Sequence, residues 1–217
     1  MSSSTDRQVR VWDLASGNSL RTLRGYTDYT YGLTFSPNSQ TLATASSNGL
    51  VRLWAWSTKI CRQTFHGHHN WVWDTTWSPD GQILASGSLD HDIRLWHPIN
   101  GSCLKILKGH ENSVMQVTWH PQGHLLASGG YDNVIRLWKP DTGQCQRIMQ
   151  VPQGWVQSLA WSPSGHILAS GSSDHLVRLW DGNTGEGQRG FQRDNSSLRH
   201  RNLDVSSNAY EPRFSYF

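Results

Sequence analysis

Near residue 70 the chain places histidines, tryptophans and an aspartate side by side, in the stretch 66-HGHHNWVWDTTWSPDG-81. Histidine and aspartate side chains ligate zinc and act as general acids and bases. Tryptophan side chains supply large aromatic surfaces, which lie either in a hydrophobic core or at a binding site. The residue types therefore leave three kinds of chemistry open: metal binding, catalysis and recognition.

The stretch belongs to a pattern that repeats along the chain with a period of 42 residues. The segments VRVWD, VRLWA, IRLWH, IRLWK and VRLWD each contain a tryptophan at the same point of the period, with an arginine two residues before it. The tryptophans are Trp12, Trp54, Trp96, Trp138 and Trp180. A constant period over five occurrences indicates a repeat architecture.

Each period contains four short segments with the alternation of β-strands and no helical periodicity. An apolar segment ends in a Pro-containing turn (FSPNS, WSPDG, WHPQG or WSPSG), and a strand of small residues such as ILASGSLD follows. The xRLW strand comes next, and a strand such as CLKILKGH or CRQTFHGH completes the period. The pattern predicts a repeated unit of four antiparallel strands.

These motifs resemble the WD-repeat β-propeller family. The resemblance covers about residues 2–190 and rests on the pairs Gly67-His68 and Gly109-His110, the SPDG-type turns, the LASGSxD segments and the closing tryptophan, which Asp13 and Asp181 follow in two repeats. It implies an all-β fold in which each repeat contributes one four-stranded antiparallel blade to a ring around a central channel. We therefore expect a β-propeller of four complete blades and one partial blade, arranged as an arc or an incompletely closed ring.

The repeat also sets the expected domain organisation. We expect a partial first blade at 1–24 without its inner strands, and complete blades at 25–66, 67–108, 109–150 and 151–191. The segment 192–217 contains no GH pair, no SPDG turn and no xRLW motif, so we expect a divergent, poorly ordered tail. The alternative is that 197–203 completes the first blade. Open blade edges favour self-association.

The resemblance assigns many of the polar residues to a structural role. In the family, the GH histidine joins Ser or Thr, Asp and Trp of the same blade in a buried hydrogen-bond network. The matching residues are His68, Ser86, Asp90 and Trp96 in the third blade, His110, Ser128, Asp132 and Trp138 in the fourth, and Ser170, Asp174 and Trp180 in the fifth. A constellation that recurs in successive blades favours blade stability over a catalytic site, because active sites are few per protein.

The network is expected to be incomplete elsewhere. Tyr26 and Asn48 replace the histidine and aspartate in the second blade, and Pro152 replaces the histidine in the fifth. The arginine before each tryptophan shares its strand face, and we expect its stem to cover neighbouring aromatic surface with some cation–π attraction.

A metal site is not expected. The three cysteines are 42 residues apart, so they belong to equivalent outer strands of three blades, which diverge from the axis. They are Cys61, Cys103 and Cys145. The chain contains no CxxC or HExxH spacing. We expect no metal and no cofactor.

The tryptophans of the opening stretch differ when equivalent positions of the repeats are compared. Trp77 corresponds to Phe35, Trp119 and Trp161, so its position is always aromatic and belongs to the core. The equivalents of Trp71 are Tyr29, Ser113 and Trp155, and those of Trp73 are Tyr31, Met115 and Gln157. Because these two positions tolerate Ser and Gln, blade packing does not require an aromatic residue there.

The resemblance places these two positions, and the residue before the structural aspartate, on the top rim of the central channel. The expected partner-binding face consists of Tyr29, Tyr31, Trp71, Trp73, Leu89, Met115, Tyr131 and Trp155. Asp28, Asp74 and Glu111 lie nearby in sequence. Exposed aromatic patches mark binding sites. The alternative is that the aromatic side chains fold inward and fill the channel of a narrow ring.

These residues predict a non-catalytic scaffold that binds a protein or peptide partner on the aromatic top face. A carbohydrate-binding propeller is an alternative, because aromatic faces also stack on sugar rings. An enzyme with an active site in the channel is a further alternative. Asp74 is the only acid on an inner strand, so the acid–base pair that such an enzyme needs is not evident.

Composition narrows the remaining possibilities. The chain has 217 residues, of which 36% are hydrophobic, with 12 Trp and 20 Gly. A net charge of +3 is too small to indicate nucleic-acid binding. No stretch approaches the roughly 18 apolar residues of a membrane span. The odd number of cysteines, three, argues against a disulfide framework, and the N-terminus shows no signal peptide, so we expect a cytoplasmic protein.

Overall fold

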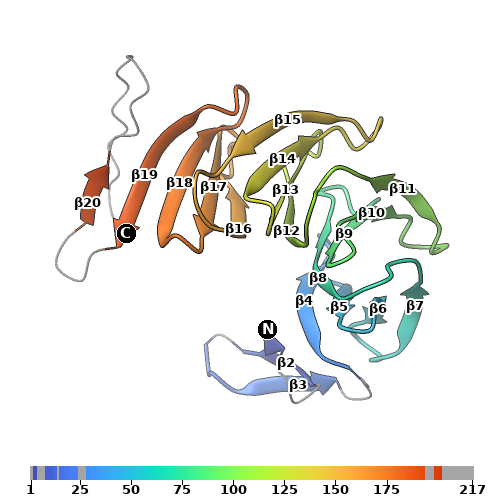
Figure 1. Ribbon diagram of the computed structural model, residues 1–217. Coiled ribbons are helices and arrows are strands. Elements are labelled where there is room, and N and C mark those ends of the chain that lie inside the picture. The colour runs from blue at the N-terminus through green and yellow to red at the C-terminus, as the bar shows by residue number, and fades with distance from the viewer. Residues whose placement is uncertain (1, 4–7, 14, 24–27, 194–197, 202–217) are drawn as a thin grey trace.

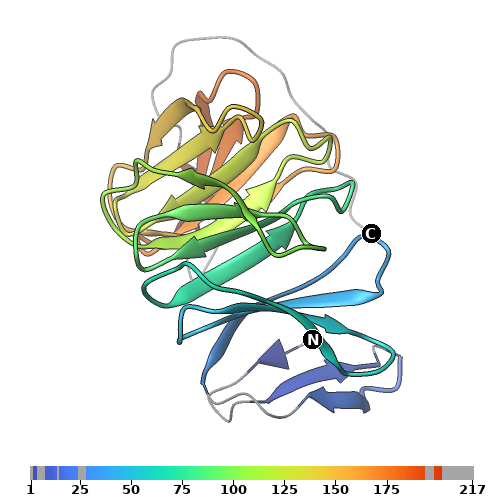
Figure 2. The same ribbon diagram turned by 90° about the vertical axis from the view of Figure 1, so that its right-hand side faces the viewer.

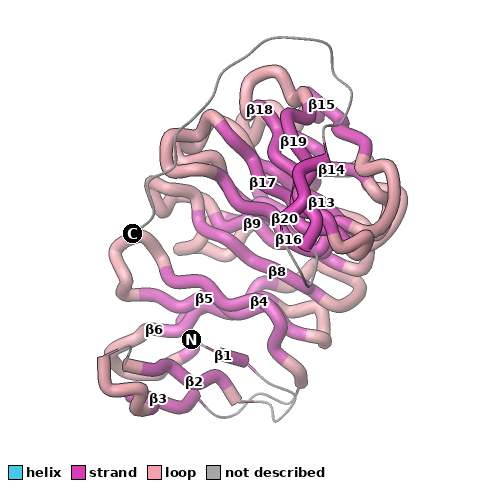
Figure 3. Tube along the Cα trace, turned by 90° about the vertical axis from the view of Figure 1, so that its left-hand side faces the viewer, coloured by secondary structure: helices cyan, strands magenta, loops and turns pink. Residues whose placement is uncertain are grey.

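The computed structural model describes residues 2–3, 8–13, 15–23, 28–193 and 198–201. Throughout these residues the chain forms strands and turns without a helix (Figure 3), and no helix long and apolar enough to cross a membrane occurs among them. Five antiparallel sheets follow one another along an arc that does not close into a ring (Figure 1). The expected all-β propeller architecture with incomplete closure is confirmed.

Each sheet is called a blade below. The first blade contains β1 (Ser2–Ser3), β2 (Val9–Trp12) and β3 (Ser19–Leu23). The second contains β4 (Thr30–Phe35), β5 (Thr41–Ser46), β6 (Val51–Ala55) and β7 (Cys61–Phe65). The third contains β8 (Val72–Trp77), β9 (Leu84–Ser88), β10 (Ile93–Trp96) and β11 (Cys103–Leu107). The fourth contains β12 (Val114–Trp119), β13 (Leu126–Gly130), β14 (Val134–Trp138) and β15 (Cys145–Gln150). The fifth contains β16 (Val156–Trp161), β17 (Ile167–Ser172), β18 (Leu176–Asp181), β19 (Gly187–Arg193) and β20 (Leu198–Arg201).

Local sequence explains the turn that joins the first two strands of a blade. In the third blade, the Ser78 amide bonds to the Ile83 carbonyl, and Gly81 adopts a φ of +72°, which a residue without Cβ reaches at no cost. The Asp80 carboxylate accepts from the Ser78 hydroxyl and from the Gln82 amide. The turn is therefore fixed by its own side chains and holds β8 antiparallel to β9.

The hydrophobic core lies between neighbouring blades. The inner strands β4, β8, β12 and β16 contact one another in that order, and Figure 2 shows the blades stacked face to face. Between the second and third blades, Leu53 and Phe65 pack with Val72, Trp77 and Trp96, and equivalent layers fill the next two junctions. Burial of both faces of a blade explains why the second strands are composed of small, almost fully buried residues.

A bulge interrupts the start of each inner strand. In β8 the register passes from Val72, paired with Ser88, to Asp74, paired with Gly87, so Trp73 has no partner residue. Met115 and Gln157 are skipped in the same way in β12 and β16. Because an extra residue in one strand redirects its side chain, the bulge frees this position from the ladder.

The two ends of the chain differ from the inner blades. Within the described residues, the first blade has no strand in the inner position, and β1 contacts β4. At the other end, β20 pairs antiparallel with β19 on the outside of the fifth blade. The hypothesis that 197–203 completes the first blade is therefore wrong for residues 198–201. Residues 194–197 and 202–217 of the predicted tail lie outside the described residues.

Candidate functional site

Four residues of the third blade are joined by hydrogen bonds around the hydroxyl of Ser86. Trp96 donates its indole N–H to this oxygen at 2.8 Å, and His68 Nε2 lies 2.8 Å from it. The other ring nitrogen, His68 Nδ1, lies 2.8 Å from a carboxylate oxygen of Asp90. Because a carboxylate only accepts, Nδ1 donates to Asp90, and in the neutral imidazole the Ser86 hydroxyl donates to Nε2.

The fourth blade repeats this network, with all three side-chain hydrogen bonds at 2.7 Å. Its members are His110, Ser128, Asp132 and Trp138. The sequence of hydrogen bonds is that of a Ser–His–Asp catalytic triad, but both serines are fully buried and also bonded to a tryptophan. A substrate cannot reach these hydroxyls. The networks instead connect the loop before the inner strand to the second and third strands of the same blade.

The network carboxylates experience two opposing influences. Burial raises the pKa of Asp90, but the hydrogen bond from His68 and its electrostatic attraction outweigh burial, so the pKa of Asp90 is lowered. The same balance lowers the pKa of Asp132 beside His110. Both carboxylates therefore stay ionised, and the stability they contribute is lost only as the pH falls through these lowered pKa values.

In the fifth blade an arginine takes the place of the missing histidine. Trp180 still donates to the Ser170 hydroxyl at 2.9 Å. Pro152 stands at the histidine position, and Asp174 forms a largely buried ion pair with Arg178. Sequence comparison assigned this arginine to aromatic surface alone, because nothing in one strand shows that a carboxylate from the preceding turn lies within its reach.

The second blade keeps only part of the network. Trp54 donates to the Thr44 hydroxyl at 3.1 Å, whereas Asn48 donates its side-chain amide to Asp28 at 2.7 Å. Tyr26, at the histidine position, lies outside the described residues. The bond between the repeated tryptophan and a Ser or Thr hydroxyl is thus present in all four complete blades.

Asp74 lies between two inner strands instead of on the exposed face. One carboxylate oxygen accepts from the Gln116 side-chain amide at 2.7 Å and from the Val117 backbone N–H at 3.0 Å. Desolvation between β8 and β12 raises the pKa of Asp74 to about 6, against these hydrogen bonds. Asp74 therefore joins two blades and does not present a free carboxylate to a cationic partner, as its position in the sequence had suggested.

The remaining histidines and cysteines are dispersed. In the part of the chain that the structure describes, no three His, Cys, Asp or Glu side chains are grouped as metal ligands would be. Cys61, Cys103 and Cys145 are free thiols on β7, β11 and β15. His66 and His69 are exposed on either side of the buried His68.

Three of the expected partner-binding residues form an aromatic cluster where the second blade meets the third. The Tyr31 ring lies 4.6 Å from that of Trp73 and stacks on that of Trp71 at 5.8 Å, and the two tryptophans meet edge to face at 5.5 Å. Trp71 is 41% exposed. Trp73 is partly buried and donates its indole N–H to the Ser113 hydroxyl at 2.9 Å, so it is anchored to the fourth blade.

A second aromatic pair lies where the fourth blade meets the fifth. Tyr131 and Trp155 meet edge to face with ring centroids 4.6 Å apart, and Trp155 is 46% exposed. Exposure of Trp71 and Trp155 argues against the alternative in which all these rings fold inward. The two groups, Tyr31–Trp71–Trp73 and Tyr131–Trp155, are called the aromatic clusters below.

Backbone hydrogen bonds align the loops that carry the clusters. The residue before the network aspartate donates its amide to the carbonyl of the residue that enters the inner strand: Leu89 to Trp71, Tyr131 to Ser113 and Ser173 to Trp155. Ser47 donates to the carbonyl of the exposed Tyr29 in the same way. The two sequence positions therefore lie side by side in each complete blade. Leu89 and Met115 are partly buried at this end of the blades.

Four segments of the chain match the family described as "WD domain, G-beta repeat": residues 17–55, 59–97, 101–139 and 143–181. The chain belongs to the WD40 repeat family. Each matched segment of this WD40 protein begins before the outer strand of one blade and ends at the third strand of the next. The sequence repeat and the structural blade are therefore offset by one strand.

One relative matches a short segment of this WD40 protein. A 39-residue segment is 46% identical to "Nuclear distribution protein PAC1" of Mycosarcoma maydis, and it makes up 18% of this chain. The match covers 9% of the relative's length. WD40 repeats in general form non-catalytic scaffolds for protein interactions.

Replacement of Ser86 tests the network. In S86A the Trp96 indole N–H and His68 Nε2 both lose their buried partner. We expect the free energy of unfolding, measured by urea denaturation, to fall by about 2–4 kcal/mol. The matched control is T44V, which removes a partner from Trp54 alone and should cost about half as much. Equal losses in the two variants would show that the histidine contributes nothing.

The raised pKa of Asp74 predicts a pH-dependent cost. Because its folded-state pKa of about 6 exceeds the ordinary value for aspartate, stability is fully present below that ordinary value and is lost as the pH rises through 6. In D74N this loss is removed. The stability of D74N relative to wild type should therefore increase by about 1–3 kcal/mol between about pH 4 and pH 7.5, as measured by urea unfolding at each pH.

D80N is the control for D74N. The hydroxyl of Ser78 and the Gln82 amide lower the pKa of Asp80, so its stabilising effect is present at neutral pH and is lost as the pH falls. Asn38 makes the equivalent bonds in the second blade, so the substitution preserves the turn. D80N should change the slope of the free energy of unfolding against pH in the opposite sense to D74N. Parallel slopes for wild type and D74N would contradict the assignment.

Proposed function

We propose that this protein is a non-catalytic scaffold that binds a protein or peptide through its two aromatic clusters. The observation that supports this most directly is the exposure of Trp71 and Trp155, at positions where another blade carries serine. Large apolar side chains that the fold does not require, and that remain exposed to water, are typical of binding sites. Trp and Tyr are also the residues that contribute most to protein interfaces.

The two clusters support an extended or multivalent partner. Ser113, which is buried, and Met115 occupy the equivalent positions of the fourth blade, between the clusters. A partner that spans the face therefore meets aromatic surface at two places, with the fourth blade between them. Apolar side chains of the partner would be buried against the exposed tryptophans, and its Arg or Lys side chains would stack on their ring faces.

The anchors differ in what they contribute to the fold. Trp71 is exposed and stacks on Tyr31, whereas Trp73 donates to Ser113. Removal of Trp71 should therefore affect binding and leave stability nearly unchanged. Removal of Trp73 also leaves the Ser113 hydroxyl without its donor. The stability of a Trp73 variant must therefore be measured alongside its affinity for the partner.

The double variant W71A/W73A tests the proposed site. A partner captured from cell extract by the immobilised wild-type chain is identified, and its Kd is measured for each variant by calorimetry. We expect W71A alone to weaken binding about 30-fold or more, and the double variant to weaken it further. The melting temperature of W71A should stay close to that of wild type.

V177S is the matched control, because Val177 is an exposed apolar residue of β18 outside both clusters. It should bind as wild type does. Unchanged affinity of W71A would show that the partner uses another surface. A glycan array incubated with the same variants separates sugar binding from peptide binding: Trp71-dependent binding to glycans, without any captured protein, would favour the carbohydrate alternative.

A further inference from the structure

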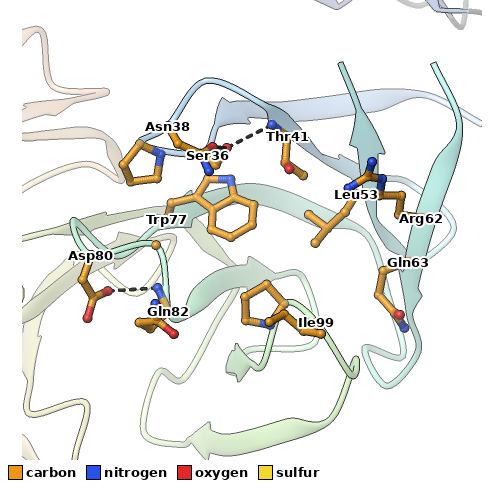
Figure 4. A pocket seen from close by; sticks show the side chains of 13 residues that line it. Ser36, Asn38, Thr41, Leu53, Arg62, Gln63, Trp77, Asp80, Gln82 and Ile99 are labelled. Atoms are coloured by element: carbon orange, nitrogen blue, oxygen red, sulfur yellow. Dashed lines mark hydrogen bonds between the residues drawn. The ribbon is translucent and has the colours of Figure 1, made fainter. Parts of the chain in front are cut away.

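A cavity of about 430 Å³ opens at the junction of the second and third blades, at the end of β8 opposite to the aromatic clusters. Figure 4 shows Trp77 in its centre, with Leu53 and Arg62 of the second blade to one side. Ile99, from the turn between β10 and β11, lies at its edge. This size is within the range of cavities that bind small molecules and peptide side chains.

The cavity arises because this junction lacks the contacts that close the next two. Trp119, the equivalent of Trp77, donates its indole N–H across the junction to the Thr76 carbonyl at 3.3 Å. At the following junction the imidazole of His120 lies 4.8 Å from the Trp161 ring and fills the space. Within the described part of the chain, the buried indole N–H of Trp77 has no hydrogen-bond partner, and the same holds for that of Trp161.

The residue that leaves the space open is also apparent from the repeat. Ser36 stands in the second blade where His120 stands in the fourth, and its short side chain bonds within its own turn. Among the described residues, the second blade therefore packs apolar side chains against Trp77 but supplies no hydrogen-bond acceptor to its indole N–H.

Two residues around the cavity depart from the other repeats. Ile99 is 83% exposed, in a turn position occupied elsewhere by small or polar residues. These are Ala15, Ser57, Asp141 and Asn183. Arg62 is exposed on β7, at a position with Leu or Gln in the other four repeats. Neither residue is required by blade packing, and both lie against one hollow.

The cavity has a positive side chain at one end and a negative side chain at the other. Arg62 and Asp80 lie at opposite ends, with Trp77 between them (Figure 4). The hydrogen bond from the Ser78 hydroxyl lowers the pKa of Asp80, so its carboxylate is ionised at neutral pH. The guanidinium of Arg62 makes no hydrogen bond or ion pair with any residue that the structure describes. An anion is therefore attracted to the Arg62 end and repelled from the other.

We propose that this cavity is a second binding site, for a short extended peptide in which an apolar side chain is followed by an acidic one. The apolar side chain packs between Trp77, Leu53 and Ile99, and the carboxylate pairs with Arg62. Asp80 sets the direction in which the peptide lies, because it repels the acidic end. This site is separate from the aromatic clusters and does not depend on the proposed function.

The Trp77 indole N–H provides a direct readout by two-dimensional NMR of protein labelled with ¹⁵N at tryptophan, with the signal assigned by its loss in W77F. The probes are acetyl-Gly-Gly-Leu-Xaa-Gly-Gly-amide peptides in which Xaa is glutamate, glutamine or lysine. We expect the glutamate peptide to shift this signal saturably with a Kd of about 1 mM or tighter. The glutamine peptide should bind about fivefold more weakly and the lysine peptide more weakly still.

Variants that introduce residues from equivalent positions of other repeats are expected to keep the fold intact. R62Q introduces the residue found at position 146, and I99N introduces the residue found at position 183. R62Q should remove the preference for the glutamate peptide over the glutamine peptide, and I99N should weaken the binding of all three peptides. The control L104Q, at the position equivalent to Arg62 on β11, should bind as wild type does, and so should W71A/W73A.

Each remaining result would overturn the proposal. Absence of a saturable shift with the glutamate peptide would show that the cavity does not bind this class of peptide. Equal affinity for the three peptides, or unchanged affinity in both R62Q and I99N, would show that Arg62 and Ile99 do not recognise the ligand. Loss of binding in W71A/W73A but not in R62Q would place the peptide on the aromatic clusters instead.

Discussion

The hydrogen bond from the repeated tryptophan to a Ser or Thr hydroxyl of the neighbouring strand is the interaction on which every complete blade depends. A buried indole N–H without an acceptor lowers the free energy of unfolding by about as much as several favourable surface contacts raise it. Thr44, Ser86, Ser128 and Ser170 provide that acceptor in the four complete blades. The other members of the network vary around this bond: a histidine and aspartate complete it in two blades, and an Asp–Arg ion pair lies beside it in one.

Comparison of repeats within one chain made much of this predictable. The 42-residue period, the strand order and the incomplete ring follow from motifs that recur at fixed spacing, and the residues of the third-blade network are those that the resemblance indicated. The contrast between the Trp77 position, which is always aromatic, and the Trp71 position, which is not, likewise separated core from surface, whereas Trp73 is partly buried and bonded to Ser113. The structure agrees for Trp77, which is 9% exposed, and for Trp71, which is 41% exposed.

What sequence comparison could not reveal lies between blades. Asp74 receives its hydrogen bonds from Gln116 and Val117 of the next inner strand, and the sequence gives no indication of how far one strand is from another. The hollow beside Trp77 combines Arg62 of one blade with Ile99 of the next. Each of these two residues is unusual in its own column of the repeat, which is a signal that sequence comparison can detect. That they face the same space depends on how the sheets stack, because the period fixes each blade but not the fit between two blades.

The aromatic cluster of Tyr31, Trp71 and Trp73 and the hollow beside Trp77 both lie at the junction of the second and third blades, at opposite ends of β4 and β8. The middle of that junction is closely packed: a Cβ placed on Gly32 would approach Asp74 Cα to 2.8 Å, so a side chain has no room there. The aromatic cluster of Tyr31, Trp71 and Trp73 is therefore separated from the hollow beside Trp77 by backbone packed against backbone. Because packed strands of this kind do not deform continuously, a ligand at one end has no space through which to displace groups at the other. If both proposals are correct, the two surfaces are expected to bind independently, because no group passes from one to the other through this packed region.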